Sequence, residues 1–347
     1  MDRAMKDGKP ITSIDVAKLA GVSQSAVSRA FTPSAAVSDK TRAKIMEAAK
    51  ALKYRPNAIA RTLSTNRSRI IGMVLSQLDN LFYPTVVDKL SRALQQHGFH
   101  LMLFFAEGRD VDNALTQLLA YQLDGVVLAS TTLSSRLAKE CVNANIPVVM
   151  FNRSADGAQA SSVTSNNREG GRIAGEFLLA NGHSRIAYIA GREDSSTNRD
   201  REAGLTAALA AANASVYRRA VGNYEREDAA SAARAIFAGT KPPDAVVVAS
   251  DHMAFAVIDT LRFELGKTIP GDVSVVSFDN VPQAAWPAYE LTTIVQSVDA
   301  MVSATTNLLF DQINASEIVS SDVVVGCKLI VRKSARLSSM PKTAVKS

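Results

Sequence analysis

The sequence predicts a small all-α head followed by an α/β body of two doubly wound parallel-sheet lobes. Two observations indicate this fold class. Short helical patterns joined by tight turns fill residues 11–56, and from residue 69 onward short apolar runs alternate with helical stretches. The chain, at 347 residues, is too long for one ordinary core. Its 47% of apolar residues is enough to fold a small module and a larger body.

Positive charge is concentrated at the start of the chain. Residues 1–69 carry 14 Lys and Arg against 5 Asp and Glu, a net charge of +9, whereas the remainder carries −3 and the whole chain +6. A cationic head suits a phosphate backbone, from which it releases counterions. A solvated basic tail is the alternative, and it is disfavoured because the charges lie on patterned helices. Salt-sensitive binding to nucleic acid is therefore expected.

The head pattern predicts three short helices. Thr12 or Ser13 can cap the first helix, which ends at Gly21, while Ser23 and Ser38 can cap the second and third. The apolar positions expected on the buried face of the first helix are Ile14, Ala17, Leu19 and Ala20. The turn between the first two helices is so short that they must cross steeply, as in a helix-turn-helix motif. In that motif the second helix lies in the major groove of DNA.

The residues from Ile11 to Leu63 resemble the heads of the lactose/galactose repressor (LacI/GalR) family of bacterial transcriptional regulators. The matching segments are DVAKLAGVSQSAVSRAF, VSDKTR and YRPNAIARTL. The resemblance implies a DNA-binding domain at residues 11–56 and a hinge at 57–67 that folds in the minor groove when two subunits meet on an operator. It also implies that Leu63 wedges between central base pairs and bends the duplex.

The same resemblance implies the DNA contacts of the head. The residues implied for base readout are Gln24, Ser25 and Arg29. Those implied for the DNA backbone are Ser23, Ser28, Ser38, Thr41, Tyr54 and Asn57. Arg29 suits a guanine edge, where a bidentate contact discriminates by about 1–3 kcal/mol. Gln24 and Ser25 can also be interpreted as polar surface only.

Seven apolar runs in the body are expected to form buried parallel strands. They are residues 70–75, 101–105, 126–129, 147–151, 185–190, 245–249 and 273–278. Helical segments such as 84–97 and 198–212 supply the crossovers. This architecture resembles periplasmic sugar-binding proteins. The resemblance implies an effector-binding and dimerisation domain at 68–335, with one lobe of 68–165 plus 297–325, a second of 166–296 plus 326–335, and a tail at 336–347.

The cleft between two such lobes is expected to bind a small effector, because strand ends face each other across it. The residues that the resemblance implies there are Asn80, Phe82, Tyr83, Asn152, Arg153, Arg199, Arg201, Tyr224, Ser250, Asp279 and Gln296. Arg201 and Asp279 are the strongest candidates, since a guanidinium with a carboxylate can fix vicinal hydroxyls or an acid. Phe82 and Tyr83 can equally be core residues. Asp251 is expected to cap the helix that follows it.

Three positions depart from the common family pattern. Asn152 stands where Asp is frequent, Asn166 where Asp often precedes Asn167, and Ser250 where Asn is frequent. Two potential carboxylates near the cleft thus become neutral amides, whereas the arginines of the cleft remain. The local charge is shifted positive, and we therefore expect an anionic effector such as a sugar acid rather than a neutral sugar.

The sequence contains none of the common catalytic motifs. It has no Gly-x-Ser-x-Gly elbow, phosphate-binding loop, dinucleotide fingerprint or His-Glu-x-x-His pair, and Cys141 and Cys327 lack metal or disulfide spacing. The glycines of residues 170–175 have the wrong spacing for a nucleotide loop and are expected to pack one helix closely against another. A sugar-processing enzyme with a DNA-binding part would need a nucleophile or acid-base pair. A plain solute-binding protein would need a secretion signal, and no apolar leader opens this chain.

These observations predict a cytoplasmic, ligand-responsive transcriptional regulator, a repressor of carbohydrate or sugar-acid metabolism genes, without a cofactor, a metal or a membrane partner. A homodimer is expected to bind a pseudo-palindromic operator of double-stranded DNA. An effector between the lobes would change their angle and thereby the separation of the two hinges. The last residues lack the leucine heptads of a tetramer anchor, which favours a dimer. The effector, the operator and the sign of regulation stay open.

Overall fold

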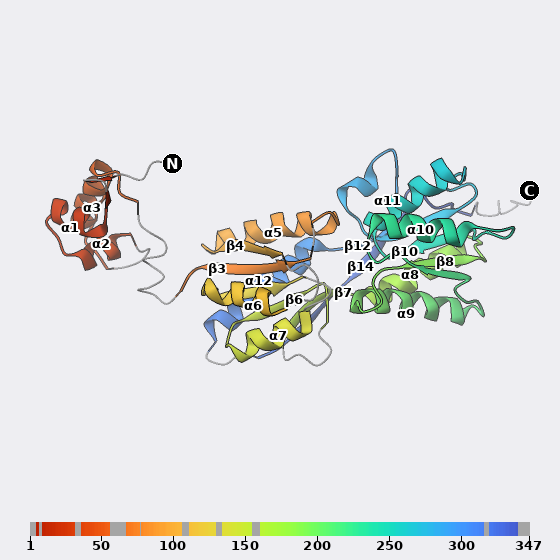
Figure 1. Ribbon diagram of the computed structural model, residues 1–347, viewed down its shortest axis with the longest axis horizontal. Helices are drawn as coiled ribbons and strands as arrows, with labels where there is room; N and C mark the ends of the chain where they lie inside the picture. The colour runs from red at the N-terminus through yellow and green to blue at the C-terminus, as the bar shows by residue number, and fades with distance from the viewer. Residues whose placement is uncertain are drawn as a thin grey trace, which may run out of the picture. The chain divides into compact units, whose positions relative to one another are not determined.

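The computed structural model describes residues 5–6, 9–31, 36–55, 67–76, 78–105, 111–129, 134–154, 160–315 and 319–338. They fall into two compact units, a head within Met1–Ser68 and a body within Arg69–Ser347 (Figure 1). In the described ranges no helix is both long enough and apolar enough to span a membrane. Asn57, Leu63 and most of the expected hinge and tail lie outside the described residues.

The head contains the three expected helices. They are α1 (Ser13–Ala20), α2 (Gln24–Ala30) and α3 (Asp39–Ala51), and a short antiparallel pair, β1 (Met5–Lys6) and β2 (Lys9–Pro10), precedes them. The Thr12 hydroxyl accepts from the Asp15 amide while the Asp15 carboxylate accepts from the Thr12 amide, so a capping box begins α1. Gly21 ends it in the left-handed conformation, with φ of 62°. Side chains of Ser23 and Ser38 cap α2 and α3.

The core of the head differs in part from the prediction. Its buried residues are Val16, Ala17, Val27, Ala30, Ile45, Ala48 and Ala49. Ile14 and Leu19, which were expected to face inward, are 47% and 56% exposed. At about 100° per residue, each lies about 110° around α1 from the middle of the face that Val16, Ala17 and Ala20 present to the other helices. One short helix crossed by two others buries only that narrow face.

A six-stranded parallel sheet forms lobe one of the body, in the order β13-β7-β6-β5-β3-β4. Its strands are β3 (Ile70–Leu75), β4 (His100–Phe105), β5 (Gly125–Leu128), β6 (Val148–Phe151), β7 (Ser161–Ser165) and β13 (Asp322–Val325). Its helices are α5 (Phe82–Gln96), α6 (Val111–Ala120), α7 (Ser134–Asn143) and α12 (Val298–Asn314). The pair α5 and α12 packs on one face, and the pair α6 and α7 covers the other (Figure 1).

Lobe two has a second six-stranded sheet, in the order β14-β12-β11-β10-β8-β9, in which only β14 is antiparallel. Its strands are β8 (Ile186–Ala190), β9 (Arg218–Val221), β10 (Ala245–Val248), β11 (Ser274–Asp279), β12 (Thr292–Gln296) and β14 (Cys327–Ile330). Its helices are α8 (Asn167–Ala180), α9 (Ser196–Ala211), α10 (Arg226–Phe237) and α11 (Asp251–Asp259), with a π turn η1 (Thr260–Glu264) and a 3-10 turn η2 (Pro282–Ala285). The chain passes between the sheets after β7, β12 and β13.

The predicted fold class is confirmed, and all seven apolar runs form strands. Among the described residues of the body, five further strands escaped prediction, namely β7, β9, β12, β13 and β14. The sequence of β7, SSVTS, is polar, yet its residues are mostly buried because their hydroxyls have partners inside the protein. Ser161 accepts from Gln312 Nε2 at 2.7 Å, and Ser162 donates to Asp322 at 2.5 Å. The hydrogen bonds that allow this strand to be buried come from other segments of the chain, and the periodicity of the sequence does not reveal them. β7 can therefore lie inside the sheet, between β13 and β6.

Glycines bring α8 and α9 into close contact. A Cβ atom on Gly171 would lie 2.0 Å from the carbonyl oxygen of Arg201, and one on Gly204 would lie 1.9 Å from that of Arg168. Both obstacles are backbone, so neither can move aside cheaply. The expectation that residues 170–175 pack one helix against its neighbour is therefore confirmed.

We predict that Gly171→Ala destabilises the body by about 1–3 kcal/mol or more, because an added methyl group must push two helix backbones apart. Chemical denaturation followed by circular dichroism measures the loss. Gly326→Ala is the matched control, since no atom lies within 4 Å of the Cβ atom it would add. Equal stability of the two variants would contradict the close packing of α8 on α9.

Candidate functional site

The outward face of α2 gathers the predicted base readers. Its exposed side chains are Gln24, Ser25, Ser28 and Arg29. Val27 and Ala30 lie on the opposite face of the helix, in the core of the head. The Gln24 amide donates to Ser13 Oγ at 3.1 Å, and Arg29 Nε lies 3.4 Å from the carbonyl of Ser25. These contacts hold two long side chains beside the face that helix-turn-helix proteins present to base edges.

Four of the residues predicted to contact the DNA backbone, Ser23, Ser38, Thr41 and Tyr54, have defined contacts within the head. The hydroxyls of Ser23 and Ser38 accept from amides at the starts of α2 and α3, so both serve as helix caps. Ser38 and Thr41 also share a hydrogen bond of 2.8 Å between their hydroxyls. Tyr54 is half-buried, with its ring 5.8 Å from that of Phe31. Helix N-termini with exposed hydroxyls are groups that hold phosphates.

In the body, Arg201 on α9 is the centre of a buried polar group. Its side chain is 2% exposed, its Nε donates to Asn167 Oδ1 at 2.8 Å and its Nη1 donates to the carbonyl of Ala249. Nη2 lies 3.5 Å from Asp279 Oδ1, and the guanidinium carbon is 4.5 Å from the centre of the Phe278 ring. One cation thus joins α8 to the ends of β10 and β11.

Asp279 has two polar partners at the end of β11. Gln296, the last residue of β12, donates to Asp279 Oδ1 at 2.6 Å, and the ion-pair contact with Arg201 is to the same oxygen. Burial raises the pKa of the Asp279 carboxyl, while the charge of Arg201 acts in the other direction. We call Asn167, Arg201, Asp279 and Gln296 the polar cluster. It lies at the carboxyl ends of strands, where open α/β sheets bind ligands.

Asp251 has another role than the one expected from the sequence. Ser250 caps α11 by accepting from the Met253 amide, and Asp251 is the first residue of the helix. The buried carboxylate of Asp251 accepts from Ser277 Oγ and from two further donors, the Thr293 hydroxyl and the Val281 amide. It therefore ties the loop after β11 to two strands of the sheet. The expectation of a cap at Asp251 was wrong because Ser250, one residue earlier, fills that position.

Several buried polar atoms around the polar cluster have no hydrogen-bond partner among the described residues. They are Arg201 Nη2, Gln296 Oε1, Asn152 Oδ1, Asn198 Nδ2 and the Tyr224 hydroxyl. Burial raises the pKa of the Tyr224 hydroxyl, and the nearby charges of Arg201 and Arg153 oppose this rise. Asn152, Tyr224 and Asp279 all have positive φ, at 57°, 64° and 118°. Such backbone strain collects at functional sites.

Two hydrogen bonds connect the loop after β6 in lobe one to the start of α9 in lobe two. The Thr197 hydroxyl donates to the carbonyl of Asn152 at 2.7 Å, and the Ser154 amide donates to Ser196 Oγ at 3.2 Å. Arg153, on the same loop, is 5% exposed. Asn152 and Arg153 therefore lie beside the helix that carries Arg201.

Other predicted effector residues are placed elsewhere. Phe82 and Tyr83 belong to the core of lobe one, where their rings are 5.5 Å apart and Phe82 also packs on Phe151. Asn80 accepts from the Phe82 amide in the turn before α5. Arg199 is exposed and reaches the carbonyl of Asp194, away from the polar cluster. Of the two alternatives for the aromatic pair, the structure favours the core.

Sequence reasoning missed the structural roles of three residues that organise the site, Asn167, Asn198 and Asp251. Asn198 accepts from the Tyr188 hydroxyl at 3.0 Å and from the Gly191 amide at 2.8 Å, and so fixes the loop after β8. The sequence did contain a pattern that could have identified them, because all three are short polar residues in the first turns of helices that follow strands.

Comparisons with known proteins agree with this architecture. Residues 13–57 match the family model described as bacterial regulatory proteins, lacI family, and residues 176–335 match a periplasmic binding protein-like domain. A repressor named PurR from Vibrio campbellii is 33% identical over 312 residues, which cover 87% of this chain and 92% of that protein. The chain belongs to the lacI family. As a lacI-family protein it is a DNA-binding transcriptional repressor and not an enzyme.

Further relatives extend over nearly the whole chain. PurR from Mannheimia succiniciproducens is 30% identical and covers 93% of this lacI-family chain and 98% of its own length. The lac repressor dimer, solved with operator and the anti-inducer ONPF, has a TM-score of 0.84 at 27% identity and covers 94% of this chain and 99% of its own. The regulator CelR, solved with cellobiose, has a TM-score of 0.70 at 30% identity, covering 94% of this chain and 100% of its own.

For the head, we predict that Arg29→Ala weakens binding to an operator selected from pseudo-palindromic duplexes by about 10- to 100-fold, since it removes about 1–3 kcal/mol of base recognition. Fluorescence anisotropy at fixed salt measures this affinity and that for a random duplex. The Lys50→Ala control removes a charge from α3, away from the reading face, and should affect both duplexes by the same factor. Equal losses on both duplexes for Arg29→Ala would exclude base readout by this residue.

For the body, we predict that Asp251→Asn changes how stability depends on pH. Burial and the charge of Asp279 raise the pKa of the Asp251 carboxyl from its usual 3.8 to about 7. The folded state thus keeps a proton that the unfolded chain releases, so this carboxyl's contribution to the free energy of unfolding falls as the pH rises through that window. Urea denaturation between about pH 4 and pH 8 should show a smaller decline for Asp251→Asn than for the wild type. Asp88→Asn, at an exposed position of α5, should retain the wild-type decline.

Proposed function

We propose that the chain is a homodimeric repressor that binds a pseudo-palindromic operator and takes a sugar or a sugar acid as its effector at the polar cluster. One observation carries the ligand half of this proposal. At the carboxyl ends of the strands, buried donors and acceptors of Arg201, Gln296 and Asn152 lack hydrogen-bond partners among the residues that the structure describes. Each unsatisfied buried group costs about 1–3 kcal/mol, so a ligand that pairs with these atoms recovers that free energy.

The mixture of unsatisfied atoms favours a polyhydroxy ligand. Arg201 Nη2 requires an acceptor, whereas Gln296 Oε1 and Asn152 Oδ1 require donors. A hydroxyl group both donates and accepts, so neighbouring hydroxyls of one sugar can meet all three needs. The solved complex of the relative CelR with cellobiose supports this class of ligand.

The choice between a neutral sugar and an acid depends on fewer residues than the sequence suggested. Asn166 caps α8 by accepting from the Glu169 amide, and Ser250 caps α11, so these two substitutions serve helix starts. Asn152 remains beside Arg153 on the loop that reaches α9. We propose that the carboxylate of a sugar acid binds near Arg153 and Arg201, where Asn152 adds no negative charge.

A purine base is the second candidate, because the name PurR of the curated relatives suggests it. The ring of Tyr224 offers a flat surface for such a base. It lies so close to Gly191 that a Cβ atom there would be 2.2 Å from the ring. A purine would stack on Tyr224 and use its ring nitrogens and exocyclic groups at the polar cluster.

Regulation is proposed to follow from the angle between the lobes of each subunit. Two heads reach successive major grooves, while the hinges, with Leu63 as the wedge, fold in the minor groove between them. An effector shifts operator affinity only by the ratio of its affinities for the two dimer states. This mechanism acts where the DNA is, in the cytoplasm.

Isothermal titration calorimetry on the full-length protein tests the ligand class. The panel consists of glucose, galactose and cellobiose, their acids gluconate and galacturonate, and the bases hypoxanthine and guanine. We expect at least one sugar or acid to bind and Arg201→Lys to weaken it at least about tenfold, since an ammonium group lacks the planar fork. Arg172→Lys on the exposed side of α8 is the control and should bind as the wild type does.

The panel also discriminates between the candidates. Binding of the bases alone would replace the sugar with a purine, and binding of neutral sugars alone would exclude an acid. Arg201→Lys that binds the same compound with unchanged affinity would exclude the polar cluster as the site.

A further inference from the structure

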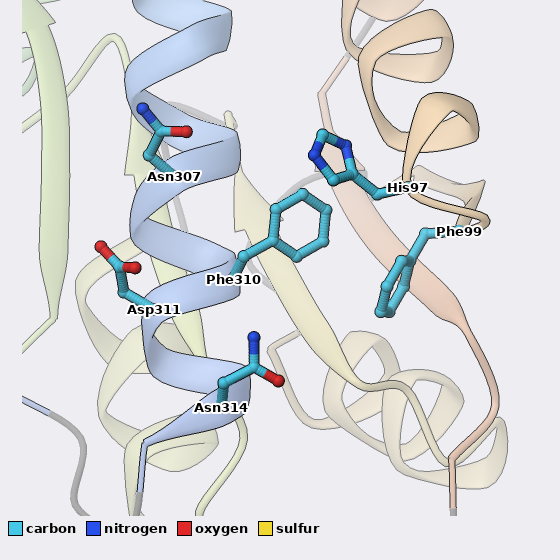
Figure 2. A pocket seen from close by; sticks show the side chains of 6 residues that line it. All are labelled: His97, Phe99, Asn307, Phe310, Asp311 and Asn314. Carbon is cyan, nitrogen blue, oxygen red and sulfur yellow. The ribbon is translucent and has the colours of Figure 1, made fainter. Parts of the chain in front are cut away.

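A second pocket lies in lobe one, at the end of the sheet where the strands begin. Its volume is about 590 Å³, and it is lined by His97, Phe99, Asn307, Phe310, Asp311 and Asn314 (Figure 2). His97 follows α5, Phe99 precedes β4, and the others form one stripe on the last turns of α12. None of these residues belongs to the polar cluster, and the pocket is therefore separate from the proposed effector site.

One side of the pocket is aromatic. The Phe310 ring is 4.5 Å from the His97 ring and 5.2 Å from the Phe99 ring, and Figure 2 shows Phe310 pointing from α12 toward both. The His97 Nδ1 atom lies 3.1 Å from the carbonyl of Ala93, to which it donates. A flat ring that packs here gains both apolar contact and aromatic stacking.

The other side is polar and acidic. In Figure 2 Asn307 and Asp311 project from α12 on the flank away from His97. Asp311 is exposed and is the only formally charged residue that lines the pocket, since the lining contains no Lys or Arg. A cationic group is therefore favoured beside Asp311, and an anion is disfavoured.

We propose that this pocket binds an arylalkylamine, a small molecule with an aromatic ring and a protonated amine on a short chain. The ring packs against Phe310 and His97, the chain crosses α12, and the amine donates to Asp311. Both halves are needed, because the aromatic and acidic surfaces lie on different flanks of one helix. No component of this site depends on the operator or on the sugar effector.

The pocket is also joined to the residue through which the chain enters the body. The Arg69 guanidinium lies 5.9 Å from the centre of the Phe99 ring, and the Arg69 carbonyl accepts from the His100 amide at 2.8 Å. The Arg69 amide donates to Asp124 Oδ2 at 2.7 Å, and its φ is 57°. Arg69 lies two residues after the end of the expected hinge of residues 57–67. A ligand that displaces Phe99 therefore also disturbs Arg69, which directly precedes β3. If the proposed function holds, such a ligand changes the affinity for the operator.

Tyramine is the probe, titrated calorimetrically into the full-length protein without DNA. The matched anion 3-(4-hydroxyphenyl)propanoate has the same ring and should not bind. We expect Asp311→Asn to weaken tyramine at least about tenfold, or about 1.4 kcal/mol. Asn307→Asp adds a second carboxylate to the pocket and should increase the affinity for tyramine several-fold. Damage to the fold would not produce such an increase. Asp299→Asn, an exposed carboxylate near the start of α12, is the control and should leave tyramine binding unchanged.

Tyramine binding that is absent, that is equal in Asp311→Asn and wild type, or that is matched by the anion would overturn the proposed site. Operator anisotropy with and without tyramine then measures the coupling through Arg69. If the operator affinity is unchanged when the protein is saturated with tyramine, the coupling through Arg69 is overturned, but the proposed binding site is not. Loss of operator binding in every protein, with intact tyramine binding, would instead count against the proposed function.

Discussion

The edge of lobe two that carries the polar cluster depends on one buried cation, the guanidinium of Arg201. It holds the side chain of Asn167, the carbonyl of Ala249 and the carboxylate of Asp279, which belong to α8 and to the loops after two strands. Removing one partner of a buried ion pair costs about 3–5 kcal/mol, because the remaining charge is left without compensation. The positions of these elements are therefore linked. The same cation also explains Gly171, since α8 must approach the Arg201 backbone too closely for any Cβ atom.

The strained backbone conformations at the site are stabilised by the buried strands that lead to it. Asn152, Tyr224 and Asp279 hold positive φ angles at the ends of β6, β9 and β11, and such conformations cost of order 1–3 kcal/mol each. Two of the strands that lead to these residues, β6 before Asn152 and β11 ending at Asp279, are buried along their whole length. Burial of apolar strands thus stabilises a polar edge that is unfavourable by itself.

The sequence was sufficient for the fold class, the three head helices and the central strands, because each has a strong local signal. Hydrophobic runs, cap residues such as Ser23 and Ser38, and the turn at Gly21 act within a few residues of one another. The polar strand β7 and the buried carboxylate of Asp251 escaped prediction because their partners are 26 to 160 residues away. For the candidate site, the resemblance implied Arg201 and Asp279 as effector residues, and the structure shows that these two side chains contact each other. The placement of Arg199 on the surface depends on the rotation of α9, which no local pattern encodes.

The contacts between the lobes provide a way for the proposed ligand to fix the angle between them. Thr197 donates to the carbonyl of Asn152, and the Ser154 amide donates to Ser196, so both bonds use backbone atoms of one loop. The unsatisfied Asn152 Oδ1 lies on that loop, and the unsatisfied Arg201 Nη2 lies on the helix that the loop contacts. A ligand that bridges these two atoms adds its own hydrogen bonds to the pair already present and holds the lobes at this angle. Whether such a ligand releases the operator or retains it then depends only on which dimer state has this angle when both heads are on DNA.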